Sequence, residues 1–543
     1  MMRSSDLTPV VDLIAERGTG PVRERRPLYV DLLPPCNNAC PAGEDIQGWL
    51  AHVQAGRYHE AWLSLVANNP LPGVHGRVCY HPCENHCNRD QVDSAVSIHA
   101  VERFLGDMAT REGWKLPIIA PPSKKRVLVV GAGPSGLSAA YHLARLGHTV
   151  EIRDAGPLPG GMLHFGIPAY RLPREELMKE VRAILAMGVE LVLEHKVEDV
   201  LAEKEAGGFD CVFLAIGAQL GKRVEIPAQD ASRLVHAVSL LRDTASGEPP
   251  KLGRRVVVYG AGNTAMDAAR TARRLGVEAV IVYRSDRAHM RAQAFEADEA
   301  VEEGVKFKWL TTIKAIEGSD LTLEEMELDS NGRPRPTGRL QTLSADSVLL
   351  ALGQETDSAF LRKVPGIEIQ ADGVVSVASN MMTGHPGIFA GGDMVPTERT
   401  VTAAVGHGKK AARYIDAWLR GGEYRAPEKH PLIPFEMLNL PVYSDAERSV
   451  QERLPVAERL VTFSEVQTGL SAEQASYEAK RCLSCGNCFE CDQCYAACPE
   501  QAIAKLGPGH RYRYLYDRCT GCAVCFEACP CHAIEMIAEP SRG

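Results

Sequence analysis

Two cysteine runs near the C-terminus have the residue type and spacing of iron–sulfur ligands. Each has three cysteines at intervals of three, a fourth cysteine four residues later, and then a proline. In two-cluster proteins built on this pattern, the fourth cysteine of each run ligates the other [4Fe–4S] cluster. Paired zinc sites do not require this doubled spacing. We therefore expect one cluster on Cys488, Cys491, Cys494 and Cys529, and another on Cys519, Cys522, Cys525 and Cys498.

The remaining cysteines are also grouped. Of 17 cysteines, five lie between residues 36 and 87, eleven lie between 482 and 531, and Cys211 stands alone. Thiols in a reducing compartment rarely form disulfides, so this grouping favours metal sites at both ends of the chain.

Between these ends, residues 127–154 (VLVVGAGPSGLSAAYHLARLGHTVEIRD) predict a strand, a glycine turn, a helix and a second strand. In the turn, Gly131, Gly133 and Gly136 let the backbone approach a pyrophosphate, which the N-terminus of the helix at Pro134 and Ser135 would bind. Asp154 ends the second strand, where an acid hydrogen-bonds a ribose diol.

The same pattern recurs at residues 256–284 (VVVYGAGNTAMDAARTARRLGVEAVIVYR), with Gly260, Gly262, Asn263, Thr264 and Ala265 in the turn. Its second strand ends in Tyr283-Arg284 rather than an acid. Arg284 could pair with a 2′-phosphate, which favours NADP over NAD, or it could be a solvated surface cation. Two adjacent folds of this kind predict FAD in one and a nicotinamide cofactor in the other. Hydride transfer between them needs no acid–base pair from the protein, so no catalytic side chain is expected.

These segments predict a multidomain fold with two tandem Rossmann-like α/β domains. Strands ending at FLAIGA (213–218) and LLALGQ (349–354, with Gly353) complete the two units, and IFAGGD (388–393) returns to the first, so the second is inserted into it. The expected domains are an α-helical iron–sulfur domain (1–121), an FAD-binding domain (122–250 and 368–425), an NAD(P)-binding domain (251–367), a linker (426–475) and an α+β two-[4Fe–4S] ferredoxin domain (476–543).

Bulk composition excludes several function classes. The net charge of -9 gives no basic face for a nucleic acid. No apolar run reaches ~18 residues, so no membrane span is expected. The first 18 residues carry acids and lack a continuous apolar segment, so we expect a cytoplasmic protein.

Three longer motifs resemble a known family: CPAGEDIQGWL (40–50), GGMLHFGIPAYRLPRE (160–175) and AGGDMVPTERTVTAAVGHGKKAA (390–412). They are similar to the small subunit of NADPH-dependent glutamate synthase, the N-terminal half of dihydropyrimidine dehydrogenase and the large subunit of electron-bifurcating ferredoxin–NADP oxidoreductase. The resemblance covers about residues 30–425. It implies a flavin site that includes Asp154, Gly161, Leu163, Arg171, Gly392 and Asp393, and a nicotinamide site that includes residues 262–265, Arg284 and Arg291. One departure weakens the preference for NADP, because Ser285 stands where the family has a second basic residue.

The resemblance also gives roles to the N-terminal cysteines. In the family, these cysteine groups hold two further [4Fe–4S] clusters, one of them completed by a Glu or Gln side chain. That position falls on Glu102, although a plain helix-surface carboxylate is the alternative, and the cysteine spacing differs from the family pattern. One cluster is therefore expected on Cys40, Cys79, Cys83 and Glu102.

The other N-terminal cluster would lack two ligands, because only Cys36 and Cys87 remain. The family supplies the missing pair from an RCxxCG sequence upstream, and here RCLSCG occurs at 481–486 instead. We hypothesise that Cys482 and Cys485 join Cys36 and Cys87, which leaves Cys211 and Cys531 as packed residues. The alternative is three clusters and four free thiols.

Together these features predict an electron-transfer subunit that links NAD(P)H, FAD and four [4Fe–4S] clusters to a larger catalytic redox subunit or a ferredoxin, in a hetero-oligomer. The alternatives are a small subunit of glutamate synthase and an electron-wire or scaffold protein that exchanges no hydride.

Overall fold

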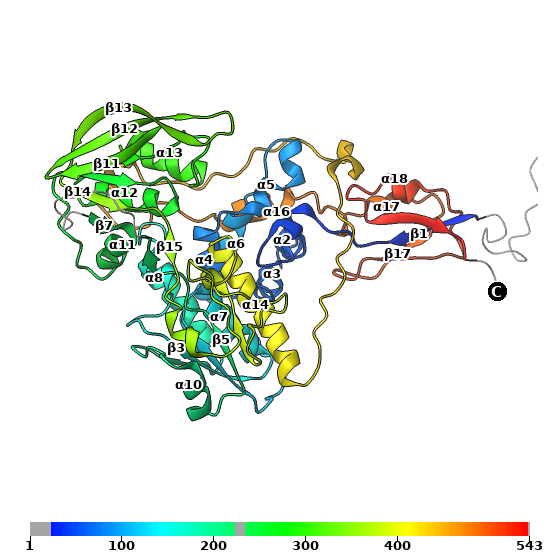
Figure 1. The fold of residues 1–543 in the computed structure, drawn as a ribbon. Coiled ribbons are helices and arrows are strands. Elements are labelled where there is room, and N and C mark those ends of the chain that lie inside the picture. The colour runs from blue at the N-terminus through cyan, green and yellow to red at the C-terminus, as the bar shows by residue number, and fades with distance from the viewer. Residues whose placement is uncertain (1–22, 223–233, 541–543) are drawn as a thin grey trace, which may run out of the picture.

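A computed structural model describes residues 23–222 and 234–540. In Figure 1 the two large sheets lie at the left, one above the other, the N-terminal helices lie in the middle, and a separate lobe lies at the right. The predicted fold class, with helices at the N-terminus, two tandem α/β units and a cysteine-rich C-terminal lobe, is confirmed.

The first α/β unit is a five-stranded parallel sheet in the order β16-β5-β2-β3-β4. The strand of this sheet that comes last in the sequence, β16, pairs with β5. The chain therefore returns to this sheet after the second unit, as predicted. The strands read as continuous apolar runs because helices cover both faces of a parallel sheet. The strands are β2 (Arg126–Val130), β3 (Thr149–Arg153), β4 (Glu190–Val192), β5 (Cys211–Leu214) and β16 (Ile388–Ala390), and the helices are α7 (Pro134–Arg145), α8 (Met162–Phe165), α9 (Arg174–Leu185), α10 (Val200–Ala206) and α14 (Val401–Leu419).

The second α/β unit has a parallel sheet in the order β10-β9-β8-β14-β7 and an antiparallel sheet in the order β11-β12-β13. A short pair, β6 (Leu220–Gly221) with β15 (Gln354–Glu355), lies where the chain passes between the units. The elements of the second unit are β7 (Leu234–His236), α11 (Ala237–Ala245), β8 (Arg255–Tyr259), α12 (Asn263–Arg274), β9 (Glu278–Val282), α13 (Ala294–Glu302), β10 (Lys306–Lys308), β11 (Thr311–Glu317), β12 (Asp320–Leu328), β13 (Pro334–Ser344) and β14 (Ser347–Leu350).

The N-terminal helices surround a core that includes the fully buried Trp49 and Leu105. Helix α16 (Ala472–Lys480), which follows the proline-rich connector, contributes Ala475 and Ala479 to this core. The segment before the cysteine-rich tail therefore packs with the N-terminal region. The N-terminal helices are α1 (Pro35–Ala39), α2 (Ile46–Gln54), α3 (Tyr58–Val66), α4 (Pro72–Val78), α5 (Pro82–Asn85) and α6 (Ile98–Glu112).

The lobe at the right of Figure 1 contains strands from both ends of the chain. Strand β1 (Arg25–Tyr29) pairs antiparallel with β19 (Ile534–Ala538). A helical domain was predicted for residues 1–121; residues 1–22 lie outside the described residues, and residues 25–29 form this strand, which was not predicted. Pairing gives the edge of β19 a partner that satisfies its backbone groups. The other elements of the lobe are α17 (Gln493–Ala497), β17 (Ile503–Lys505), β18 (Tyr512–Tyr514) and α18 (Val524–Glu527).

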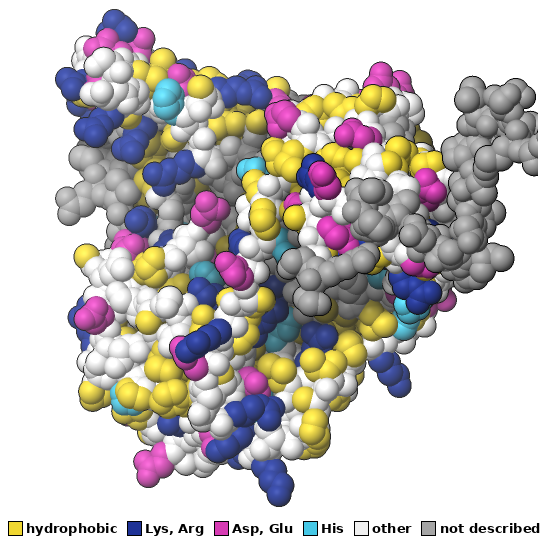
Figure 2. Space-filling model, turned by 90° about the vertical axis from the view of Figure 1, so that its right-hand side faces the viewer, with side chains coloured by type: hydrophobic (Ala, Val, Ile, Leu, Met, Phe, Trp, Pro, Cys, Tyr) yellow, Lys and Arg dark blue, Asp and Glu magenta, His cyan; other side chains and the backbone are white. Residues whose placement is uncertain are grey.

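Charges of one sign do not dominate the face of the molecule shown in Figure 2. Figure 2 shows acidic, basic and hydrophobic side chains interspersed over the face turned to the viewer, in keeping with the modest net charge of -9. Within the described residues, no helix is both long enough and apolar enough to cross a membrane.

A buried ionic cluster fixes the second unit against its neighbours. The carboxylate of Glu303 accepts bonds from Arg270 (Nε to Oε2, 2.9 Å) and Arg274 (Nη2 to Oε1, 2.9 Å), and all three side chains are at most 1% exposed. The guanidinium carbon of Arg274 lies 3.7 Å from the centroid of the Tyr170 ring, which belongs to the first unit. The junction between the units therefore depends on charges removed from water.

Replacing the carboxylate should destabilise the second unit strongly. Glu303→Gln leaves the buried guanidinium of Arg274 without a counter-charge and leaves Arg270 with Glu299 as its remaining partner, which costs about 3–5 kcal/mol. Thermal unfolding should show a clear loss. The matched variant Glu325→Gln removes an exposed partner of Arg339 and should change stability by no more than about 0.5 kcal/mol.

The same cluster predicts a pH dependence. Burial by itself would raise the pKa of Glu303, but the bonds from Arg274 and Arg270 lower it to about 2. Because the folded-state pKa lies below its ordinary value of 4.5, the interaction stabilises the fold above about pH 4.5 and is lost as the pH falls toward 2. An unfolding profile of Glu303→Gln that falls as steeply as that of the unmodified chain in this range would contradict the assignment.

Candidate cofactor and cluster sites

The first glycine turn connects β2 to α7 with no room for side chains. A Cβ on Gly131, whose φ is +109°, would lie 2.4 Å from the carbonyl oxygen of Ala215, and one on Gly136 would lie 1.9 Å from the oxygen of Gly131. A Cβ on Gly133 would meet open space, so this glycine leaves room for a ligand. Helix α7 begins at Pro134, where its unpaired amide groups face the same place.

The polar groups at this turn suit a dinucleotide. The Oδ2 atom of Asp154 accepts a bond from the amide of Ala132 at 2.6 Å, and Oδ1 accepts one from Gly156 at 2.7 Å. The Oγ atom of Ser135 is buried and has no hydrogen-bond partner among the described residues. A buried hydroxyl at a helix N-terminus is satisfied by a phosphate oxygen, so these residues fit the pyrophosphate of FAD.

Other residues of the expected flavin site converge on the same turn. A Cβ on Gly161 would lie 3.0 Å from the Cα atom of Gly133, and one on Gly392 would lie 2.9 Å from Cβ of Ser135. Leu163 is fully buried in the same core. Burial raises the pKa of Asp393 to about 6.

Arg171 points elsewhere. Its Nη1 atom lies 2.8 Å from Oδ2 of Asp267, and its Nη2 atom lies 2.6 Å from Oε1 of Glu296. Both carboxylates belong to the second unit, so in this structure Arg171 links the two units rather than approaching the glycine turn. No local sequence pattern predicts these partners.

The second glycine turn has the same geometry. A Cβ on Gly260 would lie 2.4 Å from the oxygen of Ala351, whereas one on Gly262 would meet open space. Helix α12 begins at Asn263, whose Oδ1 accepts a bond from the amide of Gln293. Thr264 and the buried Ala265 follow in its first turn.

Two arginines stand beside this turn. Arg284 and Arg291 are both exposed, and the amide of Arg291 donates to the oxygen of Ala261 in the turn. Among the described residues, neither side chain has a recorded ion pair. Ser285, which stands where the family has a second basic residue, is buried at 4% exposure, and its hydroxyl has no hydrogen-bond partner among the described residues. Gly353 follows β14 with a φ of +111°.

One set of C-terminal cysteines lines a hollow in the right-hand lobe, together with Pro27 of β1. Cys522 is exposed, whereas Cys519 and Cys525 are buried. The cysteines of this set are Cys498, Cys519, Cys522 and Cys525. They are the four expected for one crossed cluster.

The complementary set is also brought together. Burial first, and then the nearby Cys494 and Cys529, raise the pKa of the Cys488 thiol to about 12. The pKa of the Cys491 thiol is also raised, by burial first and then by Cys529 and Cys494. Cys531 is buried, with its Sγ 3.8 Å from that of Cys529.

Residues from opposite ends of the chain line a second hollow. Its cysteines are Cys36, Cys87, Cys482 and Cys485. Burial raises the pKa of the Cys36 thiol, and the other three cysteines add to the shift. The chain thus brings RCLSCG to the N-terminal helices.

The last set lies beside the first α/β unit. Burial raises the pKa of the Cys79 thiol to about 12, with Glu102 as the next contribution. Burial also raises the pKa of Cys40 and of Cys83, and Cys79 contributes to both. Glu102 is 5% exposed, so it is no surface carboxylate.

Thr402 joins this last set to the first unit. Its hydroxyl, near the start of α14, donates a bond to the Sγ atom of Cys79 at 3.0 Å. Asn69 donates to Oε1 of Glu102 at 2.8 Å and to Oε1 of the neighbouring Glu44 at 3.0 Å. The sequence analysis identified neither Thr402 nor Asn69.

The cysteine loops share one geometry. In three of them the amide two residues after a cysteine donates to its sulfur, at 3.2–3.4 Å. Amide groups aimed at sulfur stabilise the negative charge of metal-bound thiolates. The three pairs are His81 with Cys79, Ser484 with Cys482, and Gly521 with Cys519. The residues therefore fit iron–sulfur clusters in the N-terminal and C-terminal regions alike.

Short chain segments connect the four sets. Cys485 and Cys488 are three residues apart and so lie within about 11 Å of each other. Cys36 and Cys40 are four residues apart, which allows about 14 Å at most. Cys494 and Cys498, also four residues apart, join the two C-terminal sets, so the four sets form a continuous series.

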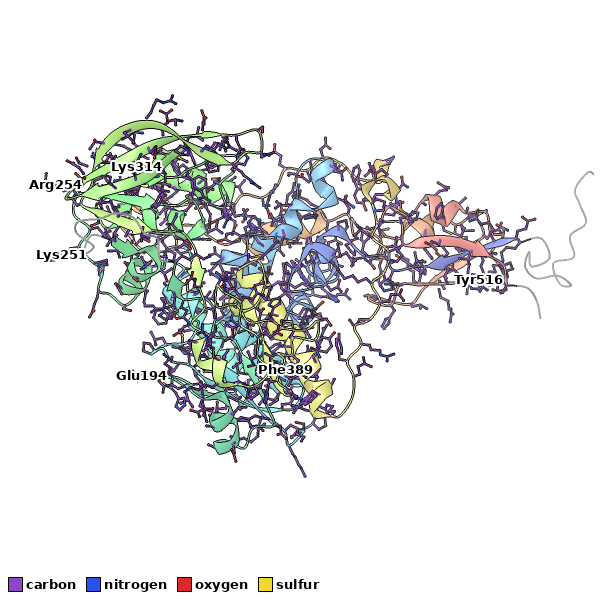
Figure 3. The ribbon with its side chains drawn as sticks, in the orientation of Figure 1. Glu194, Lys251, Arg254, Lys314, Phe389 and Tyr516 are labelled. Atoms are coloured by element: carbon purple, nitrogen blue, oxygen red, sulfur yellow. The ribbon has the colours of Figure 1, made fainter. Side chains whose placement is uncertain are left out.

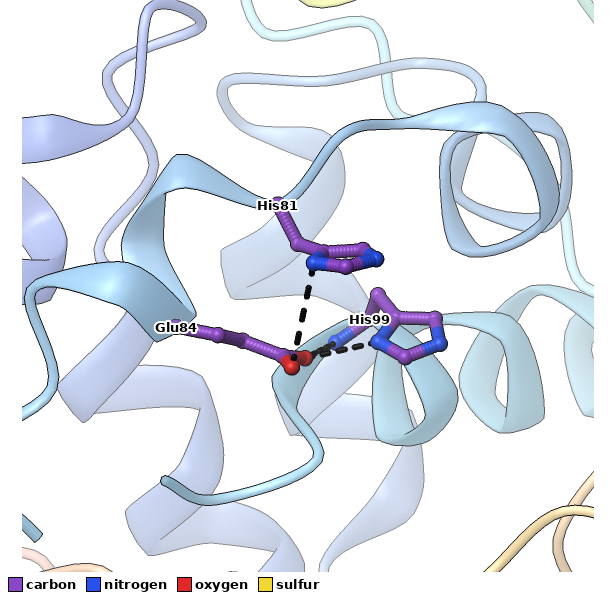
Figure 4. A group of neighbouring side chains, drawn as sticks. All are labelled: His81, Glu84 and His99. Carbon is purple, nitrogen blue, oxygen red and sulfur yellow. Dashed lines mark hydrogen bonds and ion pairs between the residues drawn. The ribbon is translucent and has the colours of Figure 1, made fainter. Parts of the chain in front are cut away.

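A histidine pair that the sequence analysis did not single out lies next to this series. Figure 4 shows His81 and His99 next to each other, both facing the Glu84 carboxylate, with their ring centroids 4.4 Å apart. His99 Nδ1 lies 2.7 Å from Oε1 of Glu84, and Arg448 forms an ion pair with Oε2 of the same Glu84 carboxylate. The ring of Phe295, from α13, stacks on His81 at 5.7 Å, so this loop also contacts the second unit.

Comparison with known proteins agrees with this organisation. Residues 125–408 match the model of the pyridine nucleotide-disulphide oxidoreductases. Residues 30–114 match dihydropyrimidine dehydrogenase domain II, a 4Fe-4S cluster domain, and residues 487–533 match a 4Fe-4S dicluster domain.

Curated relatives are similar over most of the chain. The NADP(+)-dependent formate dehydrogenase subunit beta of Moorella thermoacetica is 36% identical, covering 83% of this chain and 70% of that protein. The NADPH-Fe(3+) oxidoreductase subunit beta of Geobacter sulfurreducens is 35% identical, covering 83% and 75%. The glutamate synthase [NADPH] small chain of Escherichia coli is 33% identical, covering 71% and 89%.

These matches confirm the resemblance found in the sequence. The chain belongs to the pyridine nucleotide-disulphide oxidoreductases, in the group similar to the glutamate synthase small chain, with a dihydropyrimidine dehydrogenase-type 4Fe-4S domain before the α/β units and a 4Fe-4S dicluster domain after them.

Proposed function

We propose that this chain is an electron-transfer subunit that passes electrons between NAD(P)H, FAD, four [4Fe–4S] clusters and a partner redox protein. The observation that carries the proposal is the continuous series of four ligand sets between the first α/β unit and the right-hand lobe. The series begins at Cys79, which Thr402 of the first unit contacts, and it ends at the exposed Cys522.

The protein's own contribution is to bind and orient. The two glycine turns hold the dinucleotides, and the buried Ser135 hydroxyl meets a phosphate. When bound, the nicotinamide and the flavin supply the hydride chemistry. The loop amides and the Thr402 hydroxyl stabilise charge on the sulfur ligands.

The proposed partner is a larger catalytic redox subunit or a ferredoxin. Two of the relatives are by name beta subunits, one of a formate dehydrogenase and one of an Fe(3+) oxidoreductase. Their similarity covers 83% of this chain, whereas that of the glutamate synthase small chain covers 71%. The exposed outer set in the lobe suits electron exchange with a second protein, in either direction.

Iron analysis tests the number of clusters. Four clusters of four irons each should give about sixteen irons per chain, with an equal amount of acid-labile sulfide. The double variant Cys482→Ser/Cys485→Ser should lose about four of each, because a set of two thiolates cannot hold a cluster.

The lone buried cysteine provides the control. Cys211→Ala should retain the full content, since this residue lies in β5, away from the other cysteines. About twelve irons in the unmodified chain, with no further loss in the double variant, would contradict the shared site and leave three clusters.

Nucleotide preference tests the second glycine turn. Arg284→Ala should raise the KM for NADPH about tenfold or more, because a charge-assisted hydrogen bond to the 2′-phosphate is worth about 1.5–3 kcal/mol. The KM for NADH should be unchanged, as NADH lacks that phosphate. Anaerobic stopped-flow measurements of flavin bleaching would give both values.

The neighbouring Arg287 is a matched control, since it is also exposed but pairs with Asp298. Arg287→Ala should leave both values unchanged. Equal effects of Arg284→Ala on both nucleotides would remove the 2′-phosphate assignment. Absence of bleaching with either nucleotide would favour the scaffold alternative and refute the oxidoreductase function.

A further inference from the structure

Strand β1 places a tyrosine hydroxyl against one of the cysteines of the C-terminal lobe. The hydroxyl of Tyr29 lies 3.4 Å from the Sγ atom of Cys494. Tyr29 and Cys494 are 465 positions apart in the chain. The contact exists only because the N-terminal strand joins the C-terminal sheet.

The surrounding structure fixes the position of this hydroxyl. Tyr29 pairs with Ile534 in the β1–β19 register, and the next amide, that of Val30, donates to the oxygen of Ala533 at 3.1 Å. The Tyr29 ring stacks on Tyr514, with centroids 4.8 Å apart and an interplanar angle of 23°. Backbone and ring are thus both held, which leaves the hydroxyl little freedom to turn away.

The chemistry of the contact has one direction. A cysteine bound to iron is a thiolate and carries no proton, so the Tyr29 hydroxyl must be the donor. The sulfur lies in an apolar cluster with Ile503, Tyr512 and Ile534, where a hydrogen bond to a charged group is stronger than in water. Cys529 of the same set accepts a bond from the amide of Ala533, and Cys498 of the neighbouring set accepts one from the amide of Ala502. Such amide bonds are common to the cysteine loops, whereas Tyr29 adds a side-chain donor.

We propose that Tyr29 raises the reduction potential of the cluster on Cys488, Cys491, Cys494 and Cys529 relative to that of its neighbour on Cys519, Cys522, Cys525 and Cys498. This inference rests on the proposed function, because it requires both clusters. Hydrogen bonds to the sulfurs are among the factors that set cluster potentials. Reduction adds one negative charge to the cluster and its ligands, and the hydroxyl stabilises the reduced form more than the oxidised form.

The electron balance of the step is simple. Electron transfer would oxidise by one electron the cluster that the Cys485 set would hold, and would reduce by one electron the cluster that the Cys488 set would hold, with no proton transferred. Tyr29 keeps its proton throughout, and its hydrogen bond to Cys494 strengthens. A raised potential at this point favours transfer from the four-cysteine site shared by the two ends of the chain into the lobe.

The test is a redox titration of the full-length protein with its clusters, followed by electron paramagnetic resonance. Tyr29→Phe keeps the ring stack on Tyr514 and removes only the hydroxyl. One C-terminal cluster should become harder to reduce, with an equilibrium constant for reduction about tenfold smaller, or about 59 mV for a one-electron couple. The second C-terminal cluster should keep its potential, and iron content should not change.

Tyr516 provides the matched control. Its hydroxyl donates to the oxygen of Pro27 in the same strand at 2.9 Å, and Figure 3 places it in the same lobe. Tyr516→Phe therefore removes one tyrosine hydroxyl from the lobe, as Tyr29→Phe does, but the lost hydrogen bond is to the backbone of β1 and not to a sulfur. It should leave both potentials unchanged.

Three results would overturn the inference. These are unchanged potentials in Tyr29→Phe, equal shifts in both C-terminal clusters, and an equal shift in Tyr516→Phe. If the unmodified protein showed no pair of interacting C-terminal clusters, the proposed function itself would fail. The two failures are therefore distinguishable.

Discussion

The position of Cys485 and Cys488 is the constraint on which the rest of the arrangement depends. Only two residues separate them, yet they belong to different ligand sets. The chain cannot stretch beyond about 11 Å over that distance, so the lobe cannot move away from the N-terminal helices. The amide of Leu32 bonds the oxygen of Gly486, and the amide of Gly486 bonds the oxygen of Cys531. The N-terminal strand, the RCLSCG loop and the C-terminal loop are thereby held in one piece.

The two ends of the chain must fold together for this to happen. Helix α16 completes the N-terminal core, and β1 completes the C-terminal sheet. Each end thus supplies a part that the other lacks. Contacts of such large sequence separation have a high entropic cost of closure, which the buried core around Trp49 and the β1–β19 pairing offset.

Much of this fold could be predicted from the sequence, because its signals are local. The glycine turns at Gly131 and Gly260 follow apolar strands and open helices, and the structure has both. The crossed C-terminal cysteine sets follow from spacing alone. The partnership of RCLSCG with Cys36 was a hypothesis based on a count of ligands, and these residues do line one hollow.

What could not be predicted depends on tertiary contacts. Residues 25–29 (RRPLY) are too short to predict a strand with a partner more than 500 positions away. Arg171 lies in the family motif at residues 160–175, but its partners Asp267 and Glu296 lie in the inserted unit. No local pattern connects these positions. The carboxylate of Glu102 likewise could be judged only once its burial was known.

The backbone of the cysteine loops favours the shared cluster over four free thiols. Ser484 has a φ of +50° and His81 a φ of +38°, a region that costs non-glycine residues roughly 1–2 kcal/mol. This strain turns the amides of Ser484 and His81 toward the sulfurs of Cys482 and Cys79. The sulfur of a neutral thiol is a weak hydrogen-bond acceptor, so such a bond is too weak to offset the cost of the strained backbone. A hydrogen bond to a metal-bound thiolate is charge-assisted and stronger. The strained loop at RCLSCG is therefore better explained by a cluster ligand than by a packed cysteine.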